Sequence, residues 1–177
     1  MSRGQHPNGD DRATDVAALF HRLTQGVYVI GVADGERRDA FTAAWVMQVS
    51  FDPLLLALSV NPGNASAPIL HAGRSFTVNV LRRGQLDLAR RFGTRSGRDE
   101  DKLAGVPWRA GGRGAPILED ALAWFECDLQ ASLPAGDHEL VLGRVTGGRL
   151  EAPDAEPMTY AETGAMDGSA ELYPEQF

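Results

Sequence analysis

The stretch that decides the fold runs from Ala40 to Leu81 and reads AFTAAWVMQVSFDPLLLALSVNPGNASAPILHAGRSFTVNVL. Apolar segments alternate with short polar corners, which predicts strand, corner, strand, loop, short helix and strand in that order. Polar side chains collect where the expected strands end, where a ligand can reach them: Thr42, Gln48, Ser50, Asn61, Asn64 and Ser66. This is the arrangement by which a β-barrel would hold an anionic, planar cofactor.

The composition limits the classes of protein that the chain can belong to. It has 177 residues, 43% of them hydrophobic, which suffices for one well-buried core and is short for two. A nucleic-acid surface needs a concentrated basic face, so the formal net charge of −7 argues against nucleic acid as a partner. The single cysteine, Cys127, rules out an internal disulfide and fits a reducing compartment.

The ends of the chain set the expected domain boundaries. Residues 1–13 are polar and contain Gly and Pro, which predicts a disordered N-terminal tail. We expect one domain over 14–163 and a weakly ordered C-terminal tail over 164–177. No apolar run approaches the roughly 20 residues that span a bilayer, and the N-terminus has no apolar signal region. We therefore expect no membrane association and a cytoplasmic location.

The rest of the chain extends the β pattern. A helix is expected to begin after Thr14 or Asp15, either of which is a good N-cap. Six or more strands with few, short helices favour a closed antiparallel barrel over a doubly wound sheet. Strand count alone leaves split barrel, sandwich and other small barrels open. The expected strands lie at 27–33, 39–49, 54–60, 75–81, 121–133 and 138–150, with helices at 66–72 and 84–92 and mostly loop at 93–116. Glycines at 143, 147 and 148 are expected to relieve crowding where the last long strand bends.

The usual catalytic and metal-binding motifs are missing from the sequence. The histidines at 6, 21, 71 and 138 are far apart, and no Cys-x-x-Cys pair exists, so we expect no metal site. The run Gly112-Arg113-Gly114 lacks the third glycine and the preceding strand of a dinucleotide fingerprint. Cys127 is expected to be a small core residue rather than a nucleophile. A chain without its own reactive groups favours a borrowed cofactor.

The quoted stretch resembles the flavin reductase-like family, whose members have the FMN-binding split barrel fold. That family shows a Thr-rich strand, then S-x-D-P-P, then an N-x-x-S loop, and here Thr42, Ser50 to Pro53 and Asn61 to Ser66 carry the pattern. The likeness covers roughly residues 16–160, and the run AAWVMQVSFDP is most similar to the reductase modules of flavodiiron proteins. Leu54 replaces the second Pro, and Ala67-Pro68 follows the Ser where a basic residue or Thr is common.

The resemblance implies a mainly β split barrel with short helices that binds FMN, with FAD possible. A flavin ring needs small polar groups and an apolar face, which 42–50 would supply, and its phosphate needs hydroxyls and N–H groups, which 61–66 would supply. The alternative is that Thr42 and Ser50 only satisfy barrel corners and that Ser66 only caps its helix. The implied flavin-binding residues are Thr42, Ala43, Ala44, Trp45, Gln48, Val49, Ser50, Asn61, Asn64, Ala65, Ser66, Arg91 and Phe92. Arg90, Arg91 or another arginine could compensate for the departures in the loop.

The resemblance also implies a reaction. In the family a Gly-Asp-His turn lies beside the flavin, so His138 would meet the nicotinamide of NAD(P)H, the transient hydride donor; the alternative is a solvated turn histidine. The implied function is an NAD(P)H:flavin oxidoreductase that passes hydride to flavin and on to an acceptor such as an oxygenase. Two alternatives stay open: a flavin-binding electron-transfer or scaffold protein without a nicotinamide site, and a split barrel with another cofactor such as haem or a deazaflavin. A homodimer is implied as well, with Trp45, Phe51 and Trp124 available to cover its seam.

Overall fold

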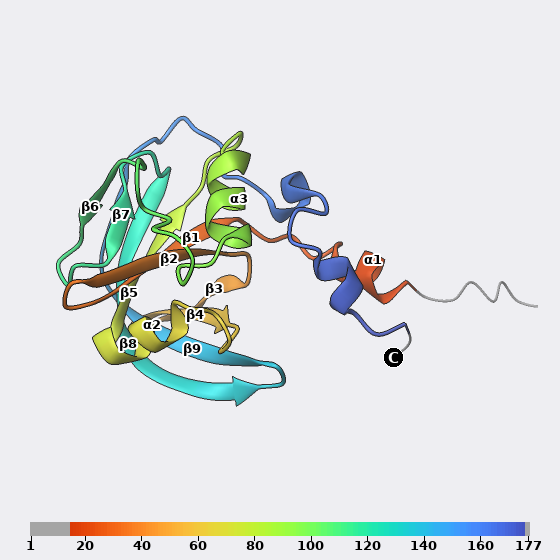
Figure 1. Cartoon of the computed structure of the whole chain (residues 1–177), viewed down its shortest axis with the longest axis horizontal. Coiled ribbons are helices and arrows are strands. Elements are labelled where there is room, and N and C mark those ends of the chain that lie inside the picture. Colours follow the sequence, from red (N-terminus) through yellow and green to blue (C-terminus); the bar gives the residue numbers. More distant parts are fainter. Residues whose placement is uncertain (1–14, 176–177) are drawn as a thin grey trace, which may run out of the picture.

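Seven strands of the described residues form one antiparallel sheet, with short helices around it (Figure 1). The structure is a computed structural model that describes residues 15–175. The expected tail at 1–13 therefore lies outside the described residues, as does Thr14. The elements are α1 (Val16–Phe20), β1 (Tyr28–Asp34), β2 (Arg37–Ala43), β3 (Val46–Phe51), β4 (Leu54–Val60), α2 (Ala67–Gly73), β5 (Ser75–Val80), α3 (Leu86–Thr94), β6 (Trp108–Ala110), β7 (Pro116–Leu118), β8 (Ala123–Ala135), β9 (His138–Leu150), and the 3-10 helices η1 (Tyr160–Thr163) and η2 (Ser169–Leu172).

The large sheet must curl because its two edge strands are neighbours in sequence. Its strand order is β2-β1-β5-β8-β9-β4-β3, so β2 and β3 lie at opposite edges although Ala44 and Trp45 alone separate them along the chain. Seven strands in a flat sheet would place the edges about 29 Å apart. The three peptide links from Ala43 to Val46 can reach at most about 11 Å. The sheet therefore rolls into a barrel that stays split between β2 and β3, which confirms the predicted antiparallel split barrel.

The single strand predicted over 39–49 was wrong, because the chain changes partner inside it. β2 pairs with β1 up to Ala43, whereas β3 pairs with β4 from Val46 onward. The backbone N–H of Val46 donates to the carbonyl of Ala44, so the link turns instead of extending. The segment 93–116, predicted to be mostly loop, also contains β6 and pairs it with β7 in a small second sheet.

Two groups of buried side chains fill the fold. One lies inside the barrel and includes Phe41, Leu58 and Phe76, together with Leu70 of α2. The other lies between the sheet and α3 and includes Phe92.

Cys127 belongs to the first group, and burial, with the charges of Asp128 and Glu126, raises the pKa of its thiol to about 12. The thiol is thus a core group and not a nucleophile at neutral pH.

The long hairpin of β8 and β9 depends on Gly143, as the sequence predicted for a crowded strand. A Cβ added at Gly143 would lie 2.3 Å from the ring of Phe76, which no packed structure tolerates. The pairing of β8 with β9 also shifts register twice, which bends the hairpin around the barrel. Gly136 has a φ of 69° in the turn between the two strands, so the turn needs a residue that adopts a left-handed conformation.

After β9 the chain returns along the outside of the barrel. The N–H of Met158 donates to the carbonyl of Leu81, and the carbonyl of Met158 accepts from the N–H of Val27. The chain then continues into η1 and η2, which project beside α1, where the rings of Phe20 and Tyr173 stack with centroids 5.2 Å apart (Figure 1). The side chain of Asp15 caps α1 by accepting from the N–H of Ala18. Between residues 15 and 175 no helix is both long and apolar enough to cross a membrane.

Candidate functional site

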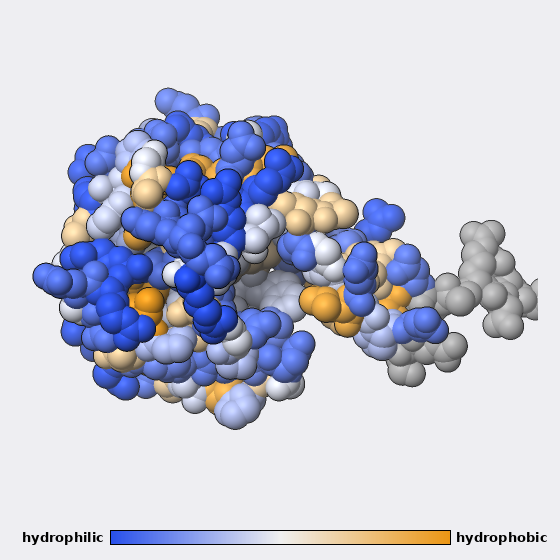
Figure 2. All heavy atoms as spheres, in the orientation of Figure 1, coloured by the Kyte–Doolittle hydropathy of each residue, from blue (hydrophilic) through white to orange (hydrophobic). Residues whose placement is uncertain are grey.

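A pocket of about 310 Å³ opens at the split of the barrel. Its volume falls at the lower end of the range for small-molecule sites. The surface is hollowed between the barrel and the projecting C-terminal segment (Figure 2). Six segments meet in this pocket: the residue before β1, the end of β2 with the β2–β3 link, the end of β4 with the loop after it, α3, the start of β9 and the C-terminal segment. Its lining residues are Val27, Phe41, Thr42, Ala43, Ala44, Trp45, Ser59, Asn61, Asn64, Gly93, His138, Tyr160, Thr163, Met166, Asp167, Ser169 and Leu172.

The polar groups of the pocket are held in place by local hydrogen bonds. The hydroxyl of Thr42 donates to the carbonyl of Ala89 at 2.8 Å, which ties β2 to α3. In the loop after β4, Asn61 Oδ1 accepts from the N–H of Gly63 at 2.8 Å, and Asn64 Oδ1 accepts from the N–H of Ser66 at 3.2 Å. Among the described residues neither amide nitrogen of the two asparagines has a partner. The loop therefore keeps its shape through the amide oxygens and leaves the amide N–H groups as donors.

Aromatic rings form the other end of the pocket. The indole of Trp45 and the imidazole of His138 face each other with centroids 5.1 Å apart and ring planes at 57°. Asp137 Oδ1 lies 2.8 Å from His138 Nδ1, and this hydrogen bond and the charge of His138 lower the pKa of Asp137. The side chain of Trp45 is 46% exposed, so a broad apolar surface faces the pocket mouth. The β8–β9 turn thus brings His138 to the link between β2 and β3.

Seven of the predicted site residues line this one pocket: Thr42, Ala43, Ala44, Trp45, Asn61, Asn64 and His138. The residues predicted further along β3 lie elsewhere. Gln48 lines a separate, mostly apolar pocket of about 340 Å³, which is formed by β3 and β4 together with β1, β5, β8 and β9. Val49 is exposed and Ser50 half-buried on the same edge strand, and Ala65 is half-buried in the loop. Their predicted contacts with flavin stay predictions.

Three further predicted residues have other partners in the structure. Ser66 is fully buried and donates its single hydroxyl proton to Asp39 at 2.6 Å, and it makes no side-chain cap on α2. Arg91 Nε donates to the carbonyl of Lys102 at 2.7 Å, and its side chain borders a different depression, between α3 and the loop at 105–107. Phe92 is buried in the core beneath α3. None of the three borders the pocket at the split.

The C-terminal wall of the pocket was missed by the sequence reasoning. Tyr160, Thr163, Met166, Asp167, Ser169 and Leu172 all come from the segment 160–172. One local signal was present: Thr159 and Glu162 form a capping box, in which Glu162 accepts from the N–H of Thr159. That pattern marks a helical turn at 160–163 but says nothing of where the turn packs.

Tyr160 holds this wall together. Its hydroxyl donates to Asp167 Oδ2 at 2.7 Å and lies 2.8 Å from Ser169 Oγ. Burial raises the pKa of Tyr160 to about 12, so the hydroxyl keeps its proton at neutral pH and can donate it. Asp167 Oδ1 also accepts from the N–H of Ser169 at 3.0 Å, which fixes the start of η2.

Comparison with known proteins identifies the family. The family model described as "Flavin reductase like domain" matches residues 20–169. The chain belongs to this family. It is 38% identical over 149 residues to a high molecular weight rubredoxin of Moorella thermoacetica, and 37% identical over 142 residues to a putative diflavin flavoprotein of Thermosynechococcus vestitus. It is 36% identical over 146 residues to a probable flavin reductase of Rhizobium meliloti. These matches cover 83%, 80% and 82% of this chain.

The chain spans 64%, 25% and 45% of the lengths of these three relatives.

Solved structures agree with the fold. An NADH:FAD oxidoreductase of Streptomyces globisporus superposes with a TM-score of 0.76 at 31% identity, over 82% of this chain and 86% of the other. An FMN-binding protein of Thermus thermophilus gives 0.71 at 31% identity, over 86% and 81%. The flavin reductase component of a bacterial two-component tryptophan halogenase gives 0.70 at 31% identity, over 79% and 94%. The predicted family is confirmed.

The role of Tyr160 in the pocket wall can be tested by Tyr160→Phe. Loss of the hydroxyl removes its hydrogen bonds to Asp167 and Ser169, each worth about 1 kcal/mol, so local opening of 164–172 should become about fivefold or more frequent. Amide hydrogen exchange of that segment measures the change. Tyr173→Phe is the matched control, because that ring keeps its stacking on Phe20. Equal exchange in wild type and Tyr160→Phe would contradict this role.

Proposed function

We propose that this protein binds a flavin at the split of the barrel, reduces it with NAD(P)H and passes the electrons to an acceptor such as an oxygenase. One observation carries the proposal. Three segments far apart in the sequence, the end of β2, the loop after β4 and the β8–β9 turn, bring small polar, amide and aromatic groups into one pocket. Such a mixture suits a ligand that has an apolar ring system and a charged tail.

The ring end of the pocket suits a flavin ring. β2 is an edge strand of the described sheet, so one row of its backbone N–H and C=O groups has no strand partner and can bond the polar edge of a ring. The small side chains of Ala43 and Ala44 leave that row of backbone groups accessible from the pocket. Gly93 of α3 lies opposite: a Cβ there would be 3.3 Å from Thr42 and 3.5 Å from Met166. A larger residue at position 93 would therefore occupy the space between α3, β2 and the C-terminal segment, which glycine leaves open for a ligand.

The other end of the pocket suits the phosphate. Asn61 and Asn64 offer amide N–H groups there, and the guanidinium of Arg98 reaches the same loop, where Nη2 donates to the carbonyl of Gly63 at 3.1 Å. A cation at this loop compensates for Ala67 and Pro68, whose side chains cannot donate. Arg98 takes the place that the sequence left open for Arg90, Arg91 or another arginine. We propose FMN as the flavin, with FAD as the alternative. Both carry a phosphate that this end of the pocket can hold.

A bound flavin accepts hydride from reduced nicotinamide and gives up electrons to an acceptor. The chain's own contribution is to position the donor. His138 and Trp45 present two rings at the pocket mouth, where they can pack on a nicotinamide and fix its orientation. Asp137 holds the imidazole through Nδ1, so the ring has a defined plane before the donor arrives. Since nicotinamide-dependent reduction of this kind and an unpaired cysteine both fit a reducing compartment, we place the activity in the cytoplasm.

Flavin binding is tested by titrating the purified protein with FMN. We expect shifted absorbance and quenched fluorescence, and no binding up to high micromolar FMN would contradict the proposal. The variant Gly93→Leu places a side chain between Thr42 and Met166, and overpacking of about 1–3 kcal/mol should weaken FMN binding about tenfold or more. Thr94→Leu is the matched control on the same helix, because Thr94 is exposed and does not border the pocket.

The nicotinamide step is tested with His138→Ala. A mispositioned hydride donor can cost on the order of 10²-fold in rate, so reduction of bound flavin by NAD(P)H should slow while FMN affinity holds. Anaerobic stopped-flow spectroscopy isolates this step. His71→Gln serves as the control, since His71 lies outside the pocket, where it bonds Glu139 at 2.6 Å. Unchanged reduction in His138→Ala removes His138 from the mechanism, and a wild type that neither NADH nor NADPH reduces leaves the electron-transfer alternative.

We further propose that two copies of the chain associate through β3. This edge strand and the start of β4 expose Met47, Val49, Phe51 and Leu54, and Phe51 is 86% exposed. An apolar pocket of about 340 Å³ opens beside them. An exposed apolar edge strand is rarely left bare. Of the aromatic residues expected at the seam, Trp124 is already engaged, because its N–H donates to Glu151 and Arg109 covers its ring.

The dimer is tested by light scattering of wild type and Phe51→Glu. We expect a dimer for wild type and a shift toward monomer for the variant, because a carboxylate on this edge would be buried without a partner. Leu150→Glu, at an exposed apolar site on the end of β9, should leave the oligomeric state unchanged. A wild-type monomer at every accessible concentration would rule out the dimer.

A further inference from the structure

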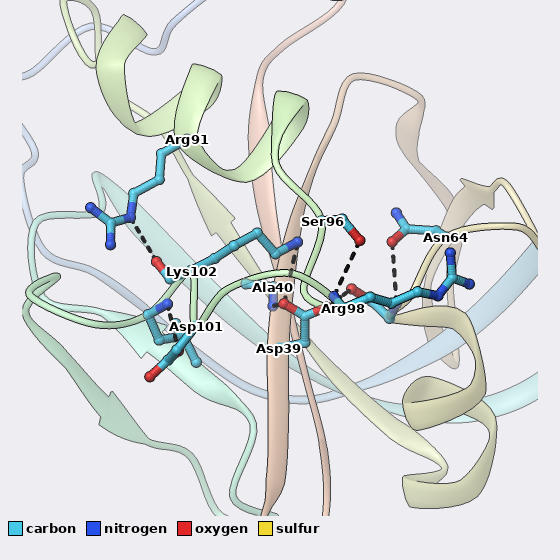
Figure 3. A network of polar contacts seen from close by, with 10 residues as sticks. Asp39, Ala40, Asn64, Arg91, Ser96, Arg98, Asp101 and Lys102 are labelled. Carbon is cyan, nitrogen blue, oxygen red and sulfur yellow. Dashed lines mark hydrogen bonds and ion pairs between the residues drawn. The ribbon is translucent and has the colours of Figure 1, made fainter.

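A buried ion pair lies next to the loop at 61–66 (Figure 3). Lys102 Nζ is 3.2 Å from Asp39 Oδ1, and the two side chains are 1% and 7% exposed. The second carboxylate oxygen, Oδ2, accepts the hydroxyl proton of Ser66 at 2.6 Å, and Oδ1 also accepts from the N–H of Ala40 at 2.8 Å. One carboxylate thus connects β2, the loop before α2 and the loop that carries Lys102.

The same carboxylate also fixes the path of the loop at 95–104. A Cβ added at Gly97 would lie 2.5 Å from Asp39 Oδ2, so the backbone of this loop rests directly on the carboxylate. The next residue is Arg98, whose guanidinium crosses to the carbonyl of Gly63 at 3.1 Å. On the far side, Arg91 Nε donates to the carbonyl of Lys102 at 2.7 Å, which ties the loop to α3. Figure 3 shows the guanidinium of Arg98 close to Asn64, with Asp39 and Lys102 to the left of both.

A buried ion pair is weak evidence for stability, because desolvation of both charges offsets their attraction. Its better attested use is to fix how segments align. Lys102 also contributes little attraction for an anion, because Asp39 neutralises its charge at contact distance. The pair therefore matters through the groups that it places: the loop of Asn64 on one side and Arg98 on the other.

We propose that Asp39 and Lys102 are positioning residues that set a preference for phosphorylated flavins over riboflavin. The pair holds the 61–66 loop and Arg98 at a fixed separation, and that separation makes a site for one phosphate group. The inference rests on the proposed flavin site. Riboflavin shares the ring and the ribityl chain but lacks the phosphate, so it reports on the rest of the pocket independently of this pair.

The test compares the dissociation constants of FMN and riboflavin in wild type and in the triple variant Asp39→Leu/Ser66→Ala/Lys102→Met. Apolar replacement of a whole buried ion pair is often neutral for folding, and Ser66→Ala removes the hydroxyl that bonds it; of the groups that bond Asp39, the backbone N–H of Ala40 loses its acceptor. We expect riboflavin affinity within about twofold of wild type and a loss of about tenfold or more in FMN affinity. Arg98→Met should lower FMN affinity selectively too. The matched control is Arg95→Met in the same loop, whose guanidinium bonds Glu100 instead, and it should leave both affinities unchanged.

The outcomes separate the two proposals. A wild type that binds neither flavin overturns the proposed function. A wild type that binds FMN and riboflavin equally well, or a triple variant that weakens both flavins equally or neither, overturns the positioning role and leaves flavin binding intact. If the triple variant does not fold, Ser66→Ala decides, since it removes the link from the loop to Asp39 and keeps the ion pair. A selective loss of FMN affinity in Ser66→Ala supports the role, and an unchanged ratio of the two affinities overturns it.

Discussion

The link of two residues between β2 and β3 constrains the whole molecule. It joins strands that lie at opposite edges of the seven-stranded sheet, so the sheet has to curl until those edges are within reach of Ala44 and Trp45. These two edges are not paired with each other: in the described sheet β2 is bonded to β1 and β3 to β4. A barrel that closes in this way keeps a permanent opening with unpaired backbone on one side. The pocket lies at that opening, and it is a consequence of the chain's connectivity more than of any single side chain.

The sequence predicts the site best where the determining signal is local. Thr42 to Trp45, Asn61 and Asn64 follow or end apolar strands, and this local pattern marks them as exposed polar groups at strand ends. β2 and β4 are not neighbours in the sheet, so their ends come together only because the sheet curls. His138 follows a glycine turn in a hairpin whose two strands could be recognised by their alternation. Ser66 and Arg91 show the limit. Each occupies the expected segment, but its side chain bonds to a group from a distant part of the chain, Asp39 or the carbonyl of Lys102, and no local pattern encodes such a partner.

The C-terminal wall was unpredictable for a different reason. Residues 164–172 have only two large apolar side chains, Met166 and Leu172, and alone this short segment could not bury enough surface to take up a fixed structure. They are held by a neighbour that is itself placed by long-range contacts. Met158 adds to the barrel through Leu81 and Val27, which sets Tyr160 at the pocket, and Tyr160 then holds Asp167 and Ser169. Each step depends on the previous one, so the wall can be inferred only after the barrel is known.

The two cations near the loop at 61–66 divide their roles by burial. Lys102 is buried and in contact with Asp39, so its charge is cancelled locally and cannot attract an incoming phosphate. Arg98 is exposed, and its guanidinium donates to a neutral carbonyl, so its positive charge is not cancelled by that contact. The planar guanidinium can donate to two phosphate oxygens at once. The buried, neutralised pair would fix the loop but would not attract a phosphate, whereas the exposed guanidinium would attract a phosphate but would not fix the loop. In the proposed phosphate site, Asn61 and Asn64 offer only neutral donors and the first residues of α2, Ala67 and Pro68, have no donor side chain. Arg98 would supply the charge there, and the buried pair would hold the loop in place.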